Sequence, residues 1–355
     1  MSNLPPSGEI PRGAIRFNTD SNKPELWDGS QWAEFQLSTP NLGRSVDTEP
    51  GARAVIGGGN DINNIDYINI SSTGNAENFG DLFEKTYQMA TFGSNTRSVW
   101  AGGSAPTTNP DDRIQFVTIS STGNTTDFGN LSQARRNPGG TGNATRGITA
   151  GGASAGETTV YDTIDYVTIS ATGNAVDFGN LTRSNMVISG GIQSPIRGVF
   201  GGGTGVAPGY AETNVIDFIT IATLGNAQDF GDLSAATAAP AGTSNSVRGI
   251  FAGGATDLVP SHVLTDDISY ITISSGGNAT SFGNLVAAYN VGQEGGTSNK
   301  IRGLFCTGYV APGPSAVSNV IQYINIATQG DAVDFGDAAV ASRYRGAVSN
   351  AHGGL

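Results

Sequence analysis

The chain has 355 residues, of which 30 are acidic and 18 basic, giving a net charge of −12 at neutral pH. Such a surface repels a phosphate backbone, so nucleic-acid binding is not expected. The single cysteine, Cys306, excludes an internal disulfide and a cysteine-based zinc site, and no apolar run is long enough for membrane insertion.

The first 36 residues predict a small β module. Strands are expected over residues 14–19, 25–28 and 32–35. The module carries four large aromatic residues and is too short to bury them by itself. We therefore expect it to dock on the rest of the chain, on a second copy in a homo-oligomer or on another protein, through Phe17, Trp27, Trp32 and Phe35.

Residues 51–355 contain six copies of one sequence unit, after a linker predicted at residues 37–50. The clearest part of the unit is a strand followed by a Gly turn and a Phe-Gly pair. It occurs as IDYINISSTGNAENFGDL, IQFVTISSTGNTTDFGNL, IDYVTISATGNAVDFGNL, IDFITIATLGNAQDFGDL, ISYITISSGGNATSFGNL and IQYINIATQGDAVDFGDA. A period of about 50 residues means that each unit buries its apolar face against its neighbours.

Each unit also contains a strand that opens with arginine and ends in glycine. It begins at Arg53, Arg97, Arg146, Arg197, Arg248 and Arg302. A further strand before the arginine, such as residues 287–297, gives four strands per unit, named a, b, c and d in chain order. The c strands are apolar on both faces, which predicts that both faces are covered. The sequence therefore predicts an all-β fold, a six-bladed β-propeller of four-stranded blades.

The end of the chain predicts how the propeller closes. The first unit begins at Arg53 without a strand a, whereas residues 341–349 supply a strand a after the sixth unit. We expect this strand to complete the first blade, so that no blade edge is left open.

Several of these sequence motifs occur together in one known class of proteins. RGVFGGG and TGNAVDFGNL, with Ser-Asn before the arginine, resemble the kelch-like propeller repeats of structural proteins of tailed bacteriophages, notably cyanophages. GAIRFNTDSNKPELWDGSQW is similar to a short β module near the ends of phage fibre and virion proteins. The tyrosine and tryptophan positions of kelch repeats are here Tyr or Phe in strand c and Phe in strand d.

The resemblance implies a non-enzymatic virion protein that is made in the host cytoplasm. It implies a tail or baseplate-associated fibre or adhesin that acts in host attachment and joins other virion proteins through residues 1–36. A host surface glycan is the implied external partner. A capsid decoration protein, a glycan-processing enzyme on the same fold and an intracellular kelch-type interaction module remain as alternatives.

The loops between strands b and c vary from unit to unit, and variable loops on a repeated scaffold commonly bind partners. They contain Tyr210 and His262, and the carboxylate pairs Asp111-Asp112 and Asp266-Asp267, which suit a sugar or a calcium ion. Ordinary solvated loops are the alternative. The six repeat arginines are expected to be structural, paired with carboxylates or carbonyls.

Catalysis has little support in the sequence. The chain has two histidines, His262 and His352, neither beside a recognisable nucleophile. The repeated box SxDxGxxW of six-bladed sialidases does not occur. We therefore expect no enzymatic activity and no cofactor.

Overall fold

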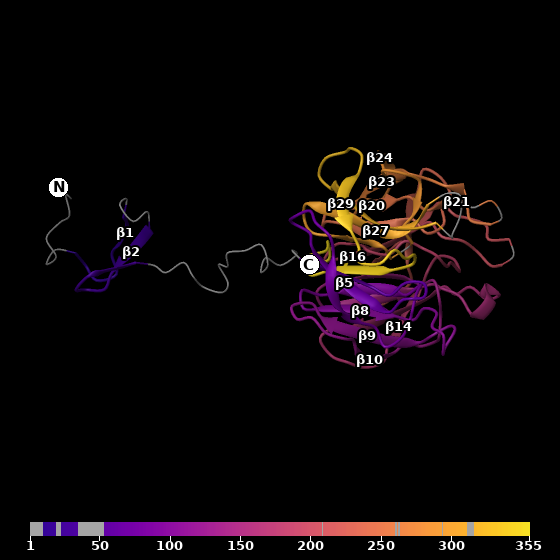
Figure 1. The fold of residues 1–355 in the computed structure, drawn as a ribbon, viewed down its shortest axis with the longest axis horizontal. Helices are drawn as coiled ribbons and strands as arrows, with labels where there is room; N and C mark the ends of the chain where they lie inside the picture. The colour runs from indigo at the N-terminus through magenta and orange to yellow at the C-terminus, as the bar shows by residue number, and fades with distance from the viewer. Residues whose placement is uncertain are drawn as a thin grey trace. The chain divides into compact units, whose positions relative to one another are not determined.

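The computed structural model describes residues 10–18, 23–34, 53–207, 209–259, 261, 263–292, 294–310 and 316–355. The chain divides into two units, Met1–Glu49 and Pro50–Leu355, and Figure 1 shows the sheets of the second. Within the described ranges, no helix is long and apolar enough to cross a membrane. The predicted linker at residues 37–50 lies outside these ranges.

Unit 1 contains one antiparallel sheet in the order β1-β2-β3. Its strands are Ile15–Asn18, Lys23–Trp27 and Trp32–Glu34, close to the predicted positions. Register pairs Arg16 with Glu25 and Trp27 with Trp32. The Arg16 guanidinium bonds to the Glu25 carboxylate at 2.7 Å and lies 4.3 Å from the centre of the Trp32 ring. One face of the sheet is thus covered by its own side chains.

Unit 2 has a β-propeller-like fold made of antiparallel sheets. In the order a-b-c-d, five sheets have four strands each: β30-β4-β5-β6, β7-β8-β9-β10, β11-β12-β13-β14, β15-β16-β17-β18 and β19-β20-β23-β24. The sixth sheet has β25 and β26 paired with β27, followed by β28 and β29. We number these sheets one to six by the position of their b strands in the chain.

The strands of unit 2 follow the predicted sequence words. The b strands are Arg53–Gly57 (β4), Arg97–Ala101 (β8), Arg146–Ala150 (β12), Arg197–Gly201 (β16), Arg248–Ala252 (β20) and Arg302–Val310 (β27). The c strands are Asn64–Asn69 (β5), Arg113–Thr118 (β9), Thr163–Thr168 (β13), Val215–Thr220 (β17), Asp267–Thr272 (β23) and Val317–Asn325 (β28). The d strands are Glu77–Asp81 (β6), Thr126–Asn130 (β10), Val176–Asn180 (β14), Gln228–Asp232 (β18), Thr280–Asn284 (β24) and Val333–Asp337 (β29).

The a strands are shorter and less regular. They are Ala90–Gly93 (β7), Gly139–Gly142 (β11), Ile192–Gln193 (β15), Ala241–Ser244 (β19), Tyr289–Asn290 (β25), Gly296–Ser298 (β26) and Gly346–Ser349 (β30). A small hairpin, Ala255–Asp257 (β21) with Val263–Leu264 (β22), and a 3-10 turn, Ala155–Glu157 (η2), lie in b–c loops. The b–c loops and the chain end lie on opposite sides of unit 2 in Figure 1.

Two predicted a strands differ from the structure. The strand expected over residues 287–297 is interrupted between β25 and β26, where Glu294 turns inward. The final strand is confirmed but shorter than residues 341–349: β30 pairs with β4, with Ser349 opposite Ala54. The residues before β30 do not extend the strand because the Tyr344 backbone is left-handed, with a φ of 60°.

The arginine that opens each b strand ties its sheet to the next one. Arg97 lies 4.5 Å from the centre of the Phe116 ring in its own sheet and donates to the Ile169 carbonyl of the next sheet at 2.7 Å. All six arginines make both contacts. Their carbonyl acceptors, in chain order of the arginines, are Ile119, Ile169, Ile221, Ile273, Ile326 and Ile70. The predicted structural pairing is confirmed, with carbonyls as the acceptors.

The Gly turn between strands c and d ties each sheet to the preceding one. In sheet two, the Gly123 N–H donates to the Phe79 carbonyl at 2.8 Å. The glycine of the Phe-Gly pair permits this approach, because a Cβ on Gly80 would meet the Gly123 carbonyl oxygen at 2.2 Å. Sheet one bonds to sheet six in the same way, from Gly74 to Phe335 at 2.9 Å. We call these repeated arginine and turn contacts the inter-sheet belt.

The a strands are the innermost strands of the sheets, and they leave little space at the centre of unit 2. A cavity of about 10 Å³ is lined by residues of β7, β15, β26 and β30 together with His352. A ring nitrogen of His352, Nε2, lies 2.9 Å from the Gly93 carbonyl oxygen, and Nδ1 accepts from the Gly354 N–H at 3.2 Å. Burial lowers the pKa of His352 to about 4. The residues after β30 therefore pack into the centre with a neutral histidine.

Candidate functional site

The first predicted carboxylate pair is built into sheet two. Asp111 is buried, and its carboxylate accepts from the Arg113 N–H at 3.1 Å. Asp112 is half-buried and accepts from the Asn130 side chain at 3.0 Å. Both carboxylates thus support the local chain, and Asp112 stays partly exposed.

The second pair lies in sheet five, which is not adjacent to sheet two along the chain. Asp266 is half-buried and Asp267 is exposed where β23 begins. His262 lies outside the described residues. In the part of the chain that the structure describes, no group of three His, Cys, Asp or Glu side chains is placed to hold a metal ion. The two pairs are therefore not brought together into one site.

The aromatic residues of unit 1 have different environments. Trp27 is buried, with its ring centre 5.5 Å from that of Trp32, which is half-buried. The expectation that the module is too small to bury its rings is thus wrong for Trp27, because the Trp pair, covered by Arg16, forms a small core. Phe17 is 59% exposed, and Phe35 lies outside the described residues.

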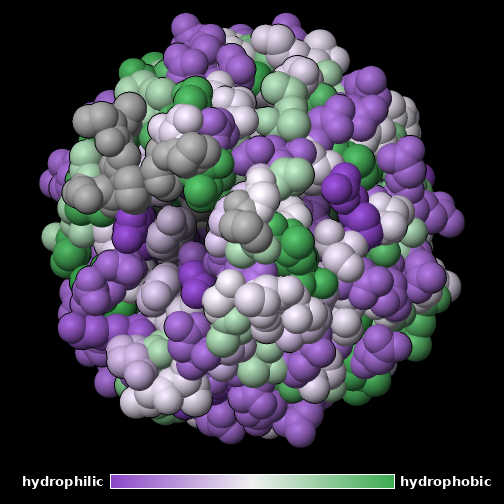
Figure 2. All heavy atoms as spheres, turned by 90° about the vertical axis from the view of Figure 1, so that its right-hand side faces the viewer, coloured by the Kyte–Doolittle hydropathy of each residue, from purple (hydrophilic) through white to green (hydrophobic). Residues whose placement is uncertain are grey.

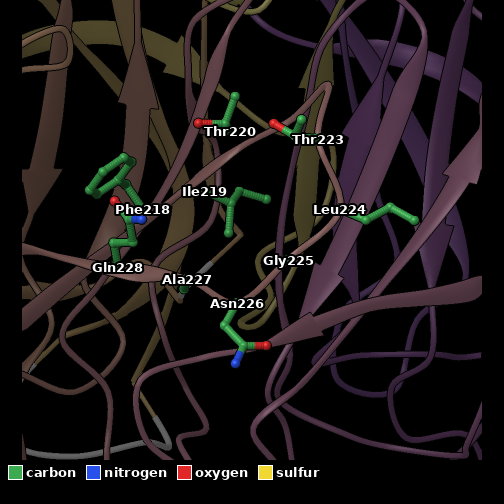
Figure 3. A pocket seen from close by; sticks show the side chains of 9 residues that line it. All are labelled: Phe218, Ile219, Thr220, Thr223, Leu224, Gly225, Asn226, Ala227 and Gln228. Carbon is green, nitrogen blue, oxygen red and sulfur yellow. The ribbon is translucent and has the colours of Figure 1, made fainter.

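A shallow recess of about 430 Å³ lies at the β17–β18 hairpin of sheet four (Figure 3). All of its lining residues fall within residues 218–228. The Gly225 N–H in this turn donates to the Phe178 carbonyl at 2.9 Å, so the recess is part of the inter-sheet belt. Leu224 is its one large exposed apolar side chain, at 57%. We do not assign a site to this hairpin.

On the other face of unit 2, which carries the b–c loops, hydrophilic and hydrophobic residues are intermingled (Figure 2). On this side, one residue shortly before each innermost strand has a left-handed backbone. These residues, with their φ angles, are Gln88 (59°), Asn137 (58°), Val187 (56°), Ala239 (52°), Gly292 (89°) and Tyr344 (60°). The backbones of the first four form a chain of hydrogen bonds, from Asn137 N–H to Gln88 O at 3.0 Å, from Val187 N–H to Asn137 O at 2.9 Å and from Ala239 N–H to Val187 O at 2.9 Å. We call this arrangement the rim.

One part of the rim is organised by Glu157 in the b–c loop of sheet three. Its carboxylate lies 3.2 Å from the Arg136 guanidinium and accepts from the Asn137 side chain at 2.9 Å. Tyr210, from the b–c loop of sheet four, lies near the same carboxylate. Burial, together with the nearby Glu157 carboxylate, raises the pKa of Tyr210. The predicted residue Tyr210 is thus brought to a polar cluster that the sequence did not reveal.

A second part of the rim is aromatic. The rings of Tyr87 and Tyr344 stack with centres 6.3 Å apart and planes inclined at 26°. Tyr309 meets Tyr344 edge-on at 6.2 Å and accepts a hydrogen bond from the Asn290 side chain at 2.9 Å. The Arg343 guanidinium lies 5.2 Å from the centre of the Tyr344 ring. Burial raises the pKa values of both Tyr309 and Tyr344, which keeps their hydroxyls protonated.

The two parts are adjacent, because the Asn137 N–H of the polar part donates to the carbonyl of Gln88, the residue after Tyr87, at 3.0 Å. We call the whole set the rim cluster. It consists of Tyr87, Arg136, Asn137, Glu157, Tyr210, Tyr309, Arg343 and Tyr344. Its residues come from d–a connections and b–c regions of several sheets, which is why no single sequence motif marks it.

The sequence analysis also missed buried charges in the core. Arg345 and Asp66 form an ion pair at 2.8 Å with both side chains fully buried, and Arg135 pairs with Asp165 in the same way. Glu294 accepts hydrogen bonds from the Thr91 hydroxyl and the Gly140 N–H, both at 2.6 Å, and so links sheets six, two and three. Burial raises the pKa of Glu294 well above its usual range. These groups stabilise particular sheets and are closed to ligands.

No family model and no curated protein matches this chain. Among solved structures, that of YjhT is similar in fold, with a TM-score of 0.58 and 11% sequence identity. The similarity covers 73% of this chain and 86% of YjhT. At this level of identity the comparison shows a shared fold and assigns no function.

Proposed function

We infer that the chain is a non-enzymatic structural protein of a tailed-phage particle. In this proposal unit 1 holds the protein on the particle, and unit 2 is a closed six-bladed propeller whose b–c loop face contacts the host surface. The resemblance of the repeat words and of residues 13–32 to phage virion proteins supports the setting. The geometry of the two units supports the division of roles.

Closure of the propeller is supported by contacts between first and last sheets. The a strands contact one another in the order β7, β11, β15, β19, β26, β30, and β30 in turn contacts β7. The inter-sheet belt runs in the same order, with Arg302 of sheet six donating to the Ile70 carbonyl of sheet one at 3.0 Å. Six sheets linked in this way leave only the short a and d strands as edges, as in a stable, independent radial scaffold.

The exposed face of unit 1 is the observation that carries the attachment role. Ile15 is 67% exposed and Phe17 is 59% exposed, and both point to the same side of β1 because they are two residues apart. Leu26, paired with Ile15, is half-buried on that side. Burial of each large apolar side chain contributes roughly 1.5–3 kcal/mol, so this face suits docking on another virion protein.

The experiment compares the full chain with a fragment of residues 51–355 during phage assembly. Mass spectrometry of purified particles should detect the full chain, and immunogold labelling should place it on the tail or baseplate. The fragment should fold as a β-rich monomer and be missing from particles. The double variant Ile15→Ser/Phe17→Ser should behave like the fragment, whereas Leu224→Ser, also exposed, should incorporate normally.

Other outcomes assign other roles. Absence of the full chain from particles overturns the virion proposal. Normal incorporation of the fragment means that unit 2 is the anchor, and label on the head supports a capsid decoration protein. Hydrolysis of a cell-wall glycan or lipopolysaccharide that is lost in the Asp266→Asn/Asp267→Asn variant would favour the glycan-processing enzyme.

A further inference from the structure

We propose that the rim cluster binds a saccharide, using tyrosine rings as a stacking surface and the Arg136–Glu157 pair as hydrogen-bonding groups. This rests on the proposed function in one respect, because a host surface glycan is the natural source of the ligand for an attachment protein. The chemistry of the site is argued from unit 2 alone.

The aromatic half of the cluster provides flat apolar surface that is open to ligands. Tyr87 and Tyr210 are half-buried, so part of each residue is accessible. The C–H groups on one face of a pyranose ring pack well against an aromatic ring, because the ring face is apolar and electron-rich. Tyr344 is held by contacts with the rings of Tyr87 and Tyr309. A fixed ring loses little conformational freedom when a ligand binds.

The polar half of the cluster provides donors and acceptors at fixed positions. Glu157 is held by Arg136 and Asn137, and the exposed fractions of the Arg136 and Glu157 side chains are 19% and 14%. A planar guanidinium and a carboxylate both bond two adjacent hydroxyls well, because their donor or acceptor atoms lie in one plane. The vicinal hydroxyls of a sugar match this spacing, and a purely apolar ligand would leave the pair desolvated without compensation.

Two buried amide oxygens at the rim point to the same ligand chemistry. Gln88 Oε1 and Asn137 Oδ1 have no hydrogen-bond partner among the described residues, although Gln88 is 8% and Asn137 is 2% exposed. The remaining rim positions carry Val187, Ala239, Gly292 and Tyr344, so these amides gather on one side. A buried acceptor without a donor costs about 1–3 kcal/mol, and a hydroxyl is a donor small enough to reach it.

The backbone of the cluster is strained in the way that binding sites often are. Tyr210 and Tyr344 have φ angles of 39° and 60°, a region that large side chains rarely adopt. Each such residue costs on the order of 1–3 kcal/mol and persists only where its surroundings fix it. The strain fixes two tyrosine rings at the rim, where a regular strand would have directed them elsewhere.

The charge of the cluster argues against other ligand classes. Arg136 is neutralised by Glu157, so a polyanion gains little there, and the net charge of −12 opposes its approach. A peptide partner needs a hydrophobic groove or an exposed sheet edge. On the b–c loop face, hydrophilic and hydrophobic residues are intermingled (Figure 2). A compact polar ligand with apolar faces fits these surroundings better.

The test uses the full chain and a panel of methyl glycosides of glucose, galactose, mannose, rhamnose and N-acetylglucosamine. Saturation-transfer NMR at about 10 mM detects even a ligand with a Kd near 1 mM. At least one glycoside should give a signal. Affinity should fall about tenfold or more in each of the variants Tyr87→Leu, Tyr210→Asn and Glu157→Gln. Asparagine is chosen at position 210 because it tolerates a left-handed backbone. The control Leu224→Ala should bind like the unchanged chain.

Melting curves separate loss of a ligand contact from loss of the fold, and the three variants should melt within about 3 °C of the parent, which corresponds to about 1 kcal/mol. No signal from any glycoside overturns the proposal, as does binding that all three variants retain.

Binding to host envelopes should be lost after periodate oxidation of vicinal diols. Envelope binding lost only after protease treatment would mean a protein partner and also overturn it. Incorporation of the protein into particles, measured separately, tests the proposed function and is independent of these results.

Discussion

The inter-sheet belt and the rim cluster occupy the same sheets and follow opposite rules. In the belt, six arginines and six Gly turns make the same contacts in every sheet. At the rim, the backbone repeats in every sheet but the side chains do not. Packing between identical sheets selects the same residue each time, whereas a ligand has no sixfold symmetry. In this fold, repeated residues build the scaffold, and positions that depart from the repeat mark the proposed site.

Removing the strand that links sheet six to sheet one should destabilise the protein most. Deleting residues 338–355 removes β30 and Arg345, which leaves β4 with a bare edge and Asp66 buried without its partner. An unpaired buried charge alone costs about 3–5 kcal/mol. We expect a loss above about 5 kcal/mol, seen as loss of cooperative thermal unfolding by circular dichroism.

The matched control for this deletion is removal of residues 1–36, which should leave the melting temperature of unit 2 unchanged. Since 1 kcal/mol shifts the midpoint of a protein of this size by about 2–4 °C, a small effect is easily measured. If the chain without residues 338–355 melts within that range of the full chain, closure by β30 is not what holds the ends together.

The second prediction concerns equivalent carboxylates in sheets three and four. Asp165 pairs with the fully buried Arg135, whereas Asp217 accepts its shortest hydrogen bond from the Thr182 hydroxyl, at 2.7 Å. Burial raises the pKa of Asp217, so its charged form is disfavoured. Asp165→Asn should lower the unfolding free energy by about 3–5 kcal/mol because it leaves Arg135 uncompensated. Asp217→Asn should change it by less than about 1 kcal/mol.

Urea denaturation at neutral pH measures both changes. Equal losses in the two variants would show that the carboxylate itself, and not its arginine, matters to the core. In the interior too, equivalent positions thus differ, since Asp165 pairs with an arginine and Asp217 with a hydroxyl.

Sequence reasoning predicted the parts of the molecule that repeat and missed those that occur once or twice. The Arg words, the Gly turns and the d-strand Phe-Gly pairs recur six times, so their spacing alone predicted the strands. Glu294 interrupts a strand in one sheet, and Arg136 with Glu157 meets Tyr210 through folding of distant loops. Of the predicted candidates, Tyr210 lies in the rim cluster, while Asp111 was misleading because it is a buried support. The position of a residue in the sequence does not show which distant side chains it contacts until the sheets are placed side by side.

The third prediction uses pH to distinguish the contribution of His352, at the centre of unit 2, to stability from the contribution of the inter-sheet belt. Belt contacts use arginines and backbone groups, which do not titrate between pH 4 and 7. The pKa of His352 is about 4 in the folded chain and near 6.5 when unfolded. The unfolded state therefore binds the proton first, so stability is complete above about pH 6.5 and falls as the pH drops toward 4.

The expected loss is on the order of 3 kcal/mol between pH 6.5 and 4. The variant His352→Gln should lose that much less over the same interval in urea titrations. Parallel acid curves for the variant and the parent would mean that another group carries the acid sensitivity.

The smallest effect tests whether the belt is as uniform in energy as it is in geometry. Arg97, Arg146, Arg197 and Arg248 each lie 4.5–4.9 Å from an aromatic ring centre and donate to an isoleucine carbonyl at 2.7–2.8 Å. Lysine keeps the charge but has no planar group to stack while it donates. Each single Arg→Lys change should cost about 1 kcal/mol, from one weakened hydrogen bond and one lost stacking contact. Because the sites share geometry, the four values should agree within about 0.5 kcal/mol in urea denaturation. Arg136→Lys at the rim should change the unfolding free energy by less than a belt substitution does, since its partner Glu157 also accepts a hydrogen bond from Asn137. If the change in unfolding free energy is several times larger at one belt arginine than at the others, that sheet depends mainly on this arginine. The belt positions would then not be equivalent in energy.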